Sequence, residues 1–145
     1  MVISTGRRML SIRSPETLSQ NHQRGLSVGK LLIILFTAPW QSENTDTVYE
    51  LAKAALLEGH EATVFCDIDA TYNLMASQIL ANRTTPAGKM AQLIEMGVQV
   101  LACQESARLR GIDVEKNLVK GAVKSSLGRL AIELMEKHDR AVAFG

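Results

Sequence analysis

Apolar residues are arranged along this chain in two different patterns. Short, continuous apolar runs are typical of strands buried on both faces of a sheet, and they occupy residues 30–37, 61–66, 98–103 and 140–144. Elsewhere apolar residues recur every three or four positions, which predicts amphipathic helices, and these cover residues 42–60, 85–97 and 125–138. Strands that alternate with helices indicate a mainly parallel sheet covered by helices on both faces.

Two further segments complete the predicted fold. Residues 69–83 fit either a helix or an ordered loop, and residues 118–124 show a weak strand pattern, so we expect the fifth strand there. The helix predicted over residues 125–138 has one apolar face. This face carries Leu127, Leu130, Ala131, Leu134 and Met135.

The first part of the chain differs in composition from the rest. Residues 1–28 are rich in arginine and serine, contain Glu16 as their one acid, and lack the apolar core of a secretory signal. We predict a flexible N-terminal extension at residues 1–28, followed by one domain at residues 29–145; a targeting segment is the alternative for the extension.

Length, charge and cysteine content narrow the function classes. The chain has 145 residues, 46% of them hydrophobic, which suits one compact domain, and a net charge of +1 without a basic face for nucleic acid. The longest apolar run, residues 31–38, is far shorter than the roughly 20 residues of a membrane helix. Two cysteines far apart suit reduced thiols. We therefore expect a cytoplasmic protein that binds neither nucleic acid nor membrane.

Several common kinds of chemistry lack their motifs. Neither a phosphate-binding glycine loop nor a G-x-S-x-G nucleophile elbow is present. The three histidines, His22, His60 and His138, lack the spacing of metal ligands, so we expect no metal site and no cofactor. The two thiols are left as the candidates for chemistry.

Cys103 stands where a reactive thiol is expected. It ends the third predicted strand, and residues 104–111 resemble a short helix whose N-terminus would favour the thiolate. Arg108 and Arg110 place positive charge nearby and are candidates to support that thiolate. The alternative is a buried cysteine that fills core space at the end of a strand.

Three motifs occupy fixed places in the predicted fold. They are a strand-ending cysteine followed after a gap by Arg-Gly and an aliphatic residue, a "TYN" triplet after the second strand, and "SSLGRLA" at the last helix. The first motif consists of Cys103 with Arg110, Gly111 and Ile112. The "TYN" triplet is residues 71–73, and "SSLGRLA" is residues 125–131. In this order and spacing, the chain from about residue 30 to residue 144 resembles the DsrE/DsrF-like family of small sulfur-relay proteins, which includes the TusD type.

The resemblance implies a fold, an activity and partners. The fold is a three-layer α/β/α sandwich. The activity is that of a sulfurtransferase, in which Cys103 accepts sulfane sulfur, holds it as a persulfide and passes it on, without metal or organic cofactor. The implied partners are a sulfur-carrier protein of the TusA type and further copies of the chain in a homotrimer or homohexamer.

Cys66, at the end of the second predicted strand, departs from the TusD-like pattern, which has an apolar or aromatic residue there. It is a candidate second, resolving thiol, and a small buried hydrophobe is the alternative. Asp67 and Asp69 follow Cys66 closely and disfavour its thiolate, whereas Cys103 begins a helix-like segment with arginines behind it. We therefore expect Cys103 to have the lower pKa of the two thiols.

Two other functions stay open at this point. One is a non-catalytic scaffold subunit of a DsrE-like oligomer, against which the presence of Cys103 argues. The other is a flavodoxin-like module that binds a small anion at the helix N-terminus.

Overall fold

The computed structural model of the protein describes residues 27–81 and 83–145. The predicted N-terminal extension, residues 1–28, therefore lies almost wholly outside the described residues, and its predicted flexibility stays a prediction.

One sheet runs through the centre of the described chain. Its five strands are all parallel and lie in the order β4-β3-β2-β1-β5. They are β1 (Lys30–Leu35), β2 (Glu61–Cys66), β3 (Gln99–Cys103), β4 (Val123–Ser125) and β5 (Arg140–Phe144). The five-stranded parallel sheet predicted from the apolar runs is confirmed, and the weak pattern at residues 118–124 contributes only the short strand β4.

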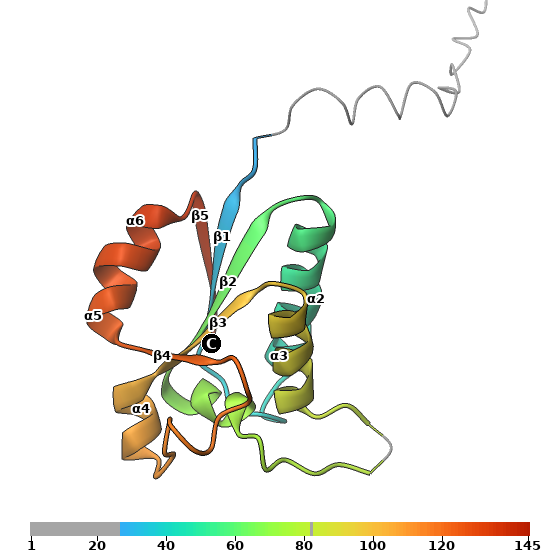
Figure 1. The fold of residues 1–145 in the computed structure, drawn as a ribbon, viewed down its shortest axis with the longest axis vertical. Coiled ribbons are helices and arrows are strands. Elements are labelled where there is room, and N and C mark those ends of the chain that lie inside the picture. Colours follow the sequence, from blue (N-terminus) through green and yellow to red (C-terminus); the bar gives the residue numbers. More distant parts are fainter. Residues whose placement is uncertain (1–26, 82) are drawn as a thin grey trace, which may run out of the picture.

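Helices form a layer on each face of the sheet, as Figure 1 shows. One layer is α2 (Asn44–Leu57) with α3 (Pro86–Glu95), and the other is α5 (Leu127–Arg129), η2 (Leu130–Leu134) and α6 (Met135–Lys137). At the carboxyl ends of the strands lie η1 (Ile68–Leu74) and α4 (Gln104–Leu109). The fold is thus a three-layer α/β/α sandwich, as predicted.

The helix predicted over residues 125–138 is less regular than its sequence pattern suggests. Ser126 caps it by accepting a hydrogen bond from the Arg129 N–H, and its middle, η2, is π-helical. Of the five apolar residues predicted to share one face, Leu130 and Leu134 are buried and the others are exposed. The π-helical turn is wider than an α-helical turn, so it moves neighbouring side chains off the face that a 3.6-residue period predicts.

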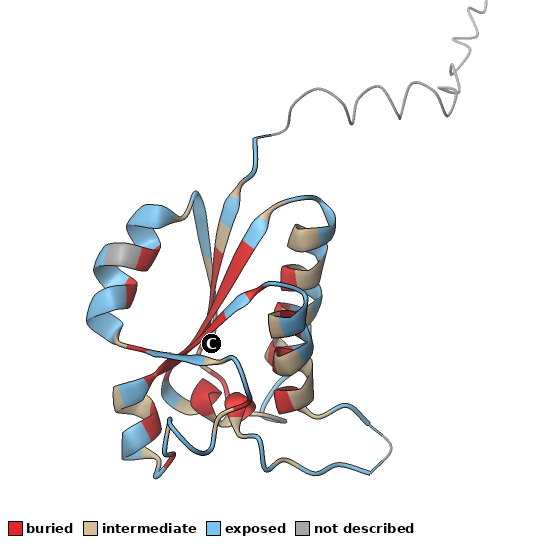
Figure 2. Ribbon diagram, in the orientation of Figure 1, coloured by how far each residue is buried: buried red, intermediate tan, exposed pale blue. Residues whose placement is uncertain are grey.

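The two faces of the sheet carry cores of different size. The larger core lies between the sheet and the α2–α3 layer, and the smaller one lies beneath α5 and η2 (Figure 2). Alternation along β3 sends Val100 and Ala102 into the larger core and Leu101 and Cys103 into the smaller one. The strand therefore presents Cys103 to the thinner side of the molecule.

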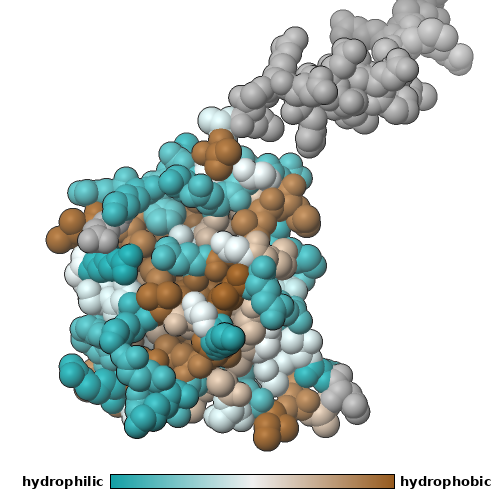
Figure 3. All heavy atoms as spheres, in the orientation of Figure 1, coloured by the Kyte–Doolittle hydropathy of each residue, from teal (hydrophilic) through white to brown (hydrophobic). Residues whose placement is uncertain are grey.

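The β4 side of the sheet is only partly covered. Val123, the first residue of β4, is 44% exposed, and Figure 3 shows apolar atoms gathered in the middle of this face with polar atoms around them. This edge of the sheet is the one nearest to β3 and to the end of that strand.

The turn before β4 depends on a glycine. Gly121 has a φ of +92°, and a Cβ added there would lie 2.7 Å from Cγ2 of Ile94, on α3. The absence of a side chain at Gly121 thus lets the turn approach α3 closely and sets where β4 begins.

We expect Gly121→Ala to destabilise the fold by about 2–4 kcal/mol, because it combines left-handed strain with overpacking against Ile94. Gly111→Ala is the matched control, since Gly111 has a φ of +71° but nothing within 4 Å of the added Cβ; it should cost about 1–2 kcal/mol. Chemical denaturation measures both. Equal losses would show that the approach of Ile94 does not matter.

Candidate functional site

Three side chains lie in a row across the carboxyl ends of β2, β3 and β4. Cys66 pairs with Ala102, so the next residues, Asp67 and Cys103, follow side by side, and Cys103 itself pairs with Ser125. Because paired residues of parallel strands face the same side, this three-residue row of Asp67, Cys103 and Ser125 faces the smaller core. Its members are 6%, 2% and 6% exposed, respectively.

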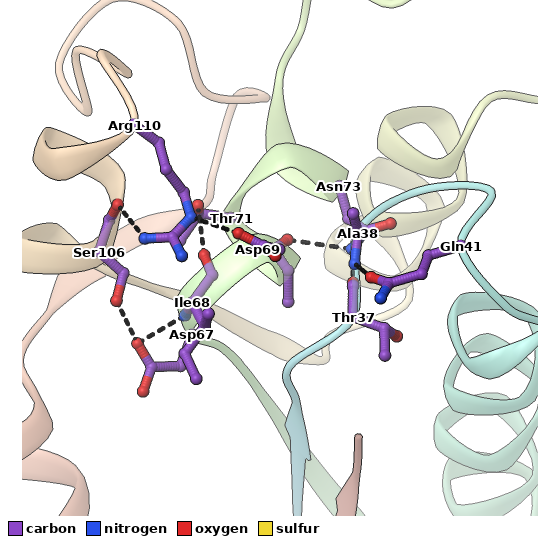
Figure 4. A network of polar contacts seen from close by, with 11 residues as sticks. Thr37, Ala38, Gln41, Asp67, Ile68, Asp69, Thr71, Asn73, Ser106 and Arg110 are labelled. Atoms are coloured by element: carbon purple, nitrogen blue, oxygen red, sulfur yellow. Dashed lines mark hydrogen bonds and ion pairs between the residues drawn. The ribbon is translucent and has the colours of Figure 1, made fainter.

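The middle of the row is tied to α4. Cys103 is the N-cap residue of α4, and Ser106, three residues later, donates a hydrogen bond from its hydroxyl to Oδ1 of Asp67 at 2.5 Å. The same carboxylate oxygen accepts the Ile68 N–H at 2.7 Å. Figure 4 shows Ser106 and Ile68 converging on Asp67. These bonds fix the first turn of α4 against the end of β2.

Opposing effects act on the Cys103 thiol. Burial raises its pKa, the Ser106 N–H and hydroxyl lower it, and the neighbouring Asp67 carboxylate raises it, with a net increase. The sulfur also lies 3.5 Å from Oε2 of Glu105, to which the thiol donates. At neutral pH Cys103 therefore rests as a thiol, whereas a helix N-terminus alone would predict a more acidic group.

The two arginines behind Cys103 have other surroundings. Arg110 donates from Nε to Oδ1 of Asp69 at 2.7 Å and from Nη1 to the Ser106 carbonyl at 3.0 Å, which joins α4 to η1 (Figure 4). Arg108 lines a hollow of about 420 Å³ beside α4. The groups that shift the pKa of Cys103 are Ser106 and Asp67, so support of the thiolate by Arg108 and Arg110 stays a prediction.

Cys66 lies on the other side of the sheet. It is fully buried in the larger core, next to Asp67 in sequence, and burial followed by the Asp67 charge raises its pKa to about 12. The sheet thus separates the Cys66 side chain from that of Cys103. This placement fits a small core residue better than a resolving thiol.

The "TYN" triplet lies beneath the site as a structural support. Thr71 and Asn73 are fully buried in η1. The Asn73 amide donates to the carbonyls of Thr37 at 2.9 Å and Ala70 at 3.0 Å, and its oxygen accepts from the Thr45 hydroxyl at 2.8 Å. One side chain thereby joins the end of β1, η1 and the start of α2, part of which is visible in Figure 4.

Comparison with known proteins places this chain. The model of the DsrE/DsrF-like family matches residues 29–144. The chain belongs to the DsrE/DsrF-like family. Two uncharacterised proteins are similar to this chain in sequence. The protein from Methanocaldococcus jannaschii is 27% identical over 79% of this chain and 99% of its own length. The protein from Methanopyrus kandleri is 24% identical over 79% of this chain and 93% of its own length.

Solved structures agree on the fold. The ychN protein from E. coli has a TM-score of 0.69 and 23% identity over 81% of this DsrE/DsrF-like chain and all of that chain. A protein of unknown function from Methanobacterium thermoautotrophicum has a TM-score of 0.61 and 17% identity over 81% of this chain and all of its own. At these identities the similarity supports the shared fold.

Two kinds of feature are absent from the part of this DsrE/DsrF-like chain that the structure describes. No cluster of three or more His, Cys, Asp or Glu side chains in residues 27–81 and 83–145 could hold a metal ion. In the same ranges no helix has the length and apolar character to cross a bilayer.

Sequence reasoning found Cys103 but missed its neighbours in the DsrE/DsrF-like site. Asp67 could have been found, because it directly follows a buried strand and parallel strands end at one edge of the sheet. Ser106 could have been inferred as the third residue of a capped helix. Ser125 could not, because the pattern over residues 118–124 does not fix the register of β4 on β3.

We expect Asp67→Asn to lower the apparent pKa of Cys103, since it removes a negative charge that opposes the thiolate. Peptide mass spectrometry across a pH series gives this pKa from the rate of iodoacetamide alkylation, and at pH 8 the rate should rise about threefold to tenfold. Asp46→Asn is the control, because Asp46 pairs with Lys89 in the α2–α3 layer. An unchanged or higher apparent pKa in Asp67→Asn would contradict this electrostatic account.

Proposed function

We propose that the protein is a cytoplasmic sulfurtransferase that carries sulfane sulfur as a persulfide on Cys103 and relays it between carrier proteins. The family is associated with sulfur relay, and the observation that carries the proposal is the position of Cys103 between two polar side chains at the end of β3. In proteins with an open parallel sheet, ligands bind at the carboxyl ends of the strands.

The transfer step is an exchange between sulfur atoms. The Cys103 thiolate attacks the outer sulfur of a donor persulfide, R–S–SH, forming a new S–S bond while the donor S–S bond breaks. The donor leaves as R–S⁻, and Cys103 becomes the persulfide, Cys103–S–SH. Atoms and electrons balance without an added oxidant or reductant, as in thiol–disulfide exchange.

Attack first requires that the thiol lose its proton. Two carboxylates are close enough to take part: Glu105, whose Oε2 lies 3.5 Å from the sulfur, and Asp67, which acts on its pKa. In the proposed mechanism one of them accepts the proton as the sulfur attacks. Burial, together with the Asp67 carboxylate, raises the pKa of Cys103 and keeps the resting thiol protonated, which limits unproductive oxidation.

Delivery to Cys103 also requires access, because the residue is 2% exposed. The cover on its side of the sheet is the smaller core, to which α5 and η2 contribute Leu130 and Leu134. Local opening costs least where few apolar contacts are lost. We propose that docking of a carrier opens this side.

The proposed partners are a sulfur-carrier protein of the TusA type and further copies of this chain in a homotrimer or homohexamer. Leu127, Ile132 and Met135 support association, since they are 56%, 64% and 52% exposed on the outer helical layer. Several exposed apolar side chains on one helical layer are a common feature of contact surfaces. Arg108 and Arg110, on and just after α4, are proposed to assist ionisation of the thiol as the site opens.

Anion binding at the N-terminus of α4 receives less support. This helix has six residues, and the carboxylates of Asp67 and Glu105 lie at its start. Both charges would repel a free anion, which has no covalent bond to hold it at the site.

The proposal predicts that incubation with a small persulfide donor adds one sulfur atom to Cys103. Cys103→Ser should abolish loading, and Cys66→Ser should retain most of it, because Cys66 lies across the sheet and its pKa is raised to about 12. Intact-mass and peptide mass spectrometry measure the added sulfur. Loading of Cys103→Ser at the wild-type rate would overturn the assignment of the relay to Cys103 and favour the anion-binding alternative.

A further inference from the structure

A buried hydroxyl next to Cys103 lacks a partner. Ser125 is 6% exposed, and within the described part of the chain its Oγ forms no hydrogen bond. A buried hydroxyl without a partner costs stability that an alanine would not. Its presence therefore calls for a role outside the stability of the fold.

The register places this hydroxyl beside the sulfur. Ser125 is the direct partner of Cys103 in the β3–β4 pair, so the two side chains project from neighbouring strands toward the same face. Asp67 lies on the opposite side of Cys103, directly after the last residue of β2. The sulfur is thus flanked by a carboxylate on one side and an uncommitted donor on the other.

The other nearby hydroxyl is already engaged. A serine hydroxyl has one hydrogen to give, and that of Ser106 is donated to Asp67, while the same hydroxyl also acts on the pKa of Cys103. Among the row and the first turn of α4, Ser125 is the residue whose hydroxyl is free to donate to a newly arrived anionic atom.

We propose that the Ser125 hydroxyl binds the outer sulfur of the Cys103 persulfide, which makes Ser125 a substrate-binding residue for sulfane sulfur. This inference rests on the proposed function. Repulsion from Asp67 directs the negatively charged outer sulfur away from β2 and toward β4, where the hydroxyl donates to it. The surrounding apolar side chains of the smaller core, such as Leu101 and Leu130, keep water from this sulfur.

The proposal predicts that one variant, Ser125→Ala, keeps or gains thermal stability and at the same time loses its sulfur faster. Ser125→Ala removes an unsatisfied buried group, so its melting temperature should equal or exceed that of the wild type. The same change removes the donor to the outer sulfur, so the loaded persulfide should be lost to a small thiol acceptor on the order of tenfold faster. A merely structural serine would move both quantities in the same direction.

The experiment loads wild type, Ser125→Ala, Ser125→Thr and Ser77→Ala with a small persulfide. Mass spectrometry of the Cys103 peptide follows loss of sulfur to dithiothreitol, and calorimetry of the unloaded proteins gives their melting temperatures. Ser125→Thr keeps the hydroxyl and should restore retention to within about twofold of wild type. Ser77 is exposed in the loop after η1, so Ser77→Ala should behave as wild type.

The outcomes separate this inference from the proposed function. Loading of the wild type with equal retention in Ser125→Ala would overturn the role of Ser125 and leave the relay function standing. A lower melting temperature in Ser125→Ala, with no rescue by Ser125→Thr, would also overturn it. Failure of the wild type to load at all would overturn both.

Discussion

Parallel pairing of β2, β3 and β4 is the constraint on which the rest of the structure depends. Since the strands run in one direction and end at one edge, their registers bring Asp67, Cys103 and Ser125 together from three separate parts of the sequence. Side-chain alternation then assigns all three to one face. A slip of one residue in β2 would bring Cys66 to that face in place of Asp67.

The site combines burial with a proposed reaction that needs an anionic sulfur. Burial and the Asp67 carboxylate both raise the pKa of Cys103, while the start of α4 lowers it only in part. In the folded state the thiol therefore stays protonated as the pH rises past the pKa of an unfolded cysteine. Because the unfolded state loses this proton first, the contribution of Cys103 to folding stability declines in alkaline solution. Such a site suits a carrier that reacts when a partner docks and is otherwise protected from oxidation.

The strands and most helices were predictable because their signals are local. Apolar runs identified β1, β2, β3 and β5, and the position of Cys103 followed from the end of a run. The surroundings of Cys103 were harder to predict, since they depend on pairing between distant segments. Arg110 is close to Cys103 in sequence, but its ion pair with Asp69 of η1 could not be predicted from that proximity. Ser125 was beyond prediction because β4 is only three residues long and its register is set by tertiary packing.

The central claim is that sulfane sulfur is held at the carboxyl end of β3, on the α5 side of the sheet. A crystal structure of the protein loaded with sulfur from a polysulfide tests it most directly. The account predicts one additional sulfur atom bonded to Sγ of Cys103 and lying within hydrogen-bond distance of Oγ of Ser125. Additional density on Cys66, or an outer sulfur on Cys103 that points away from Ser125 toward β2, would contradict it.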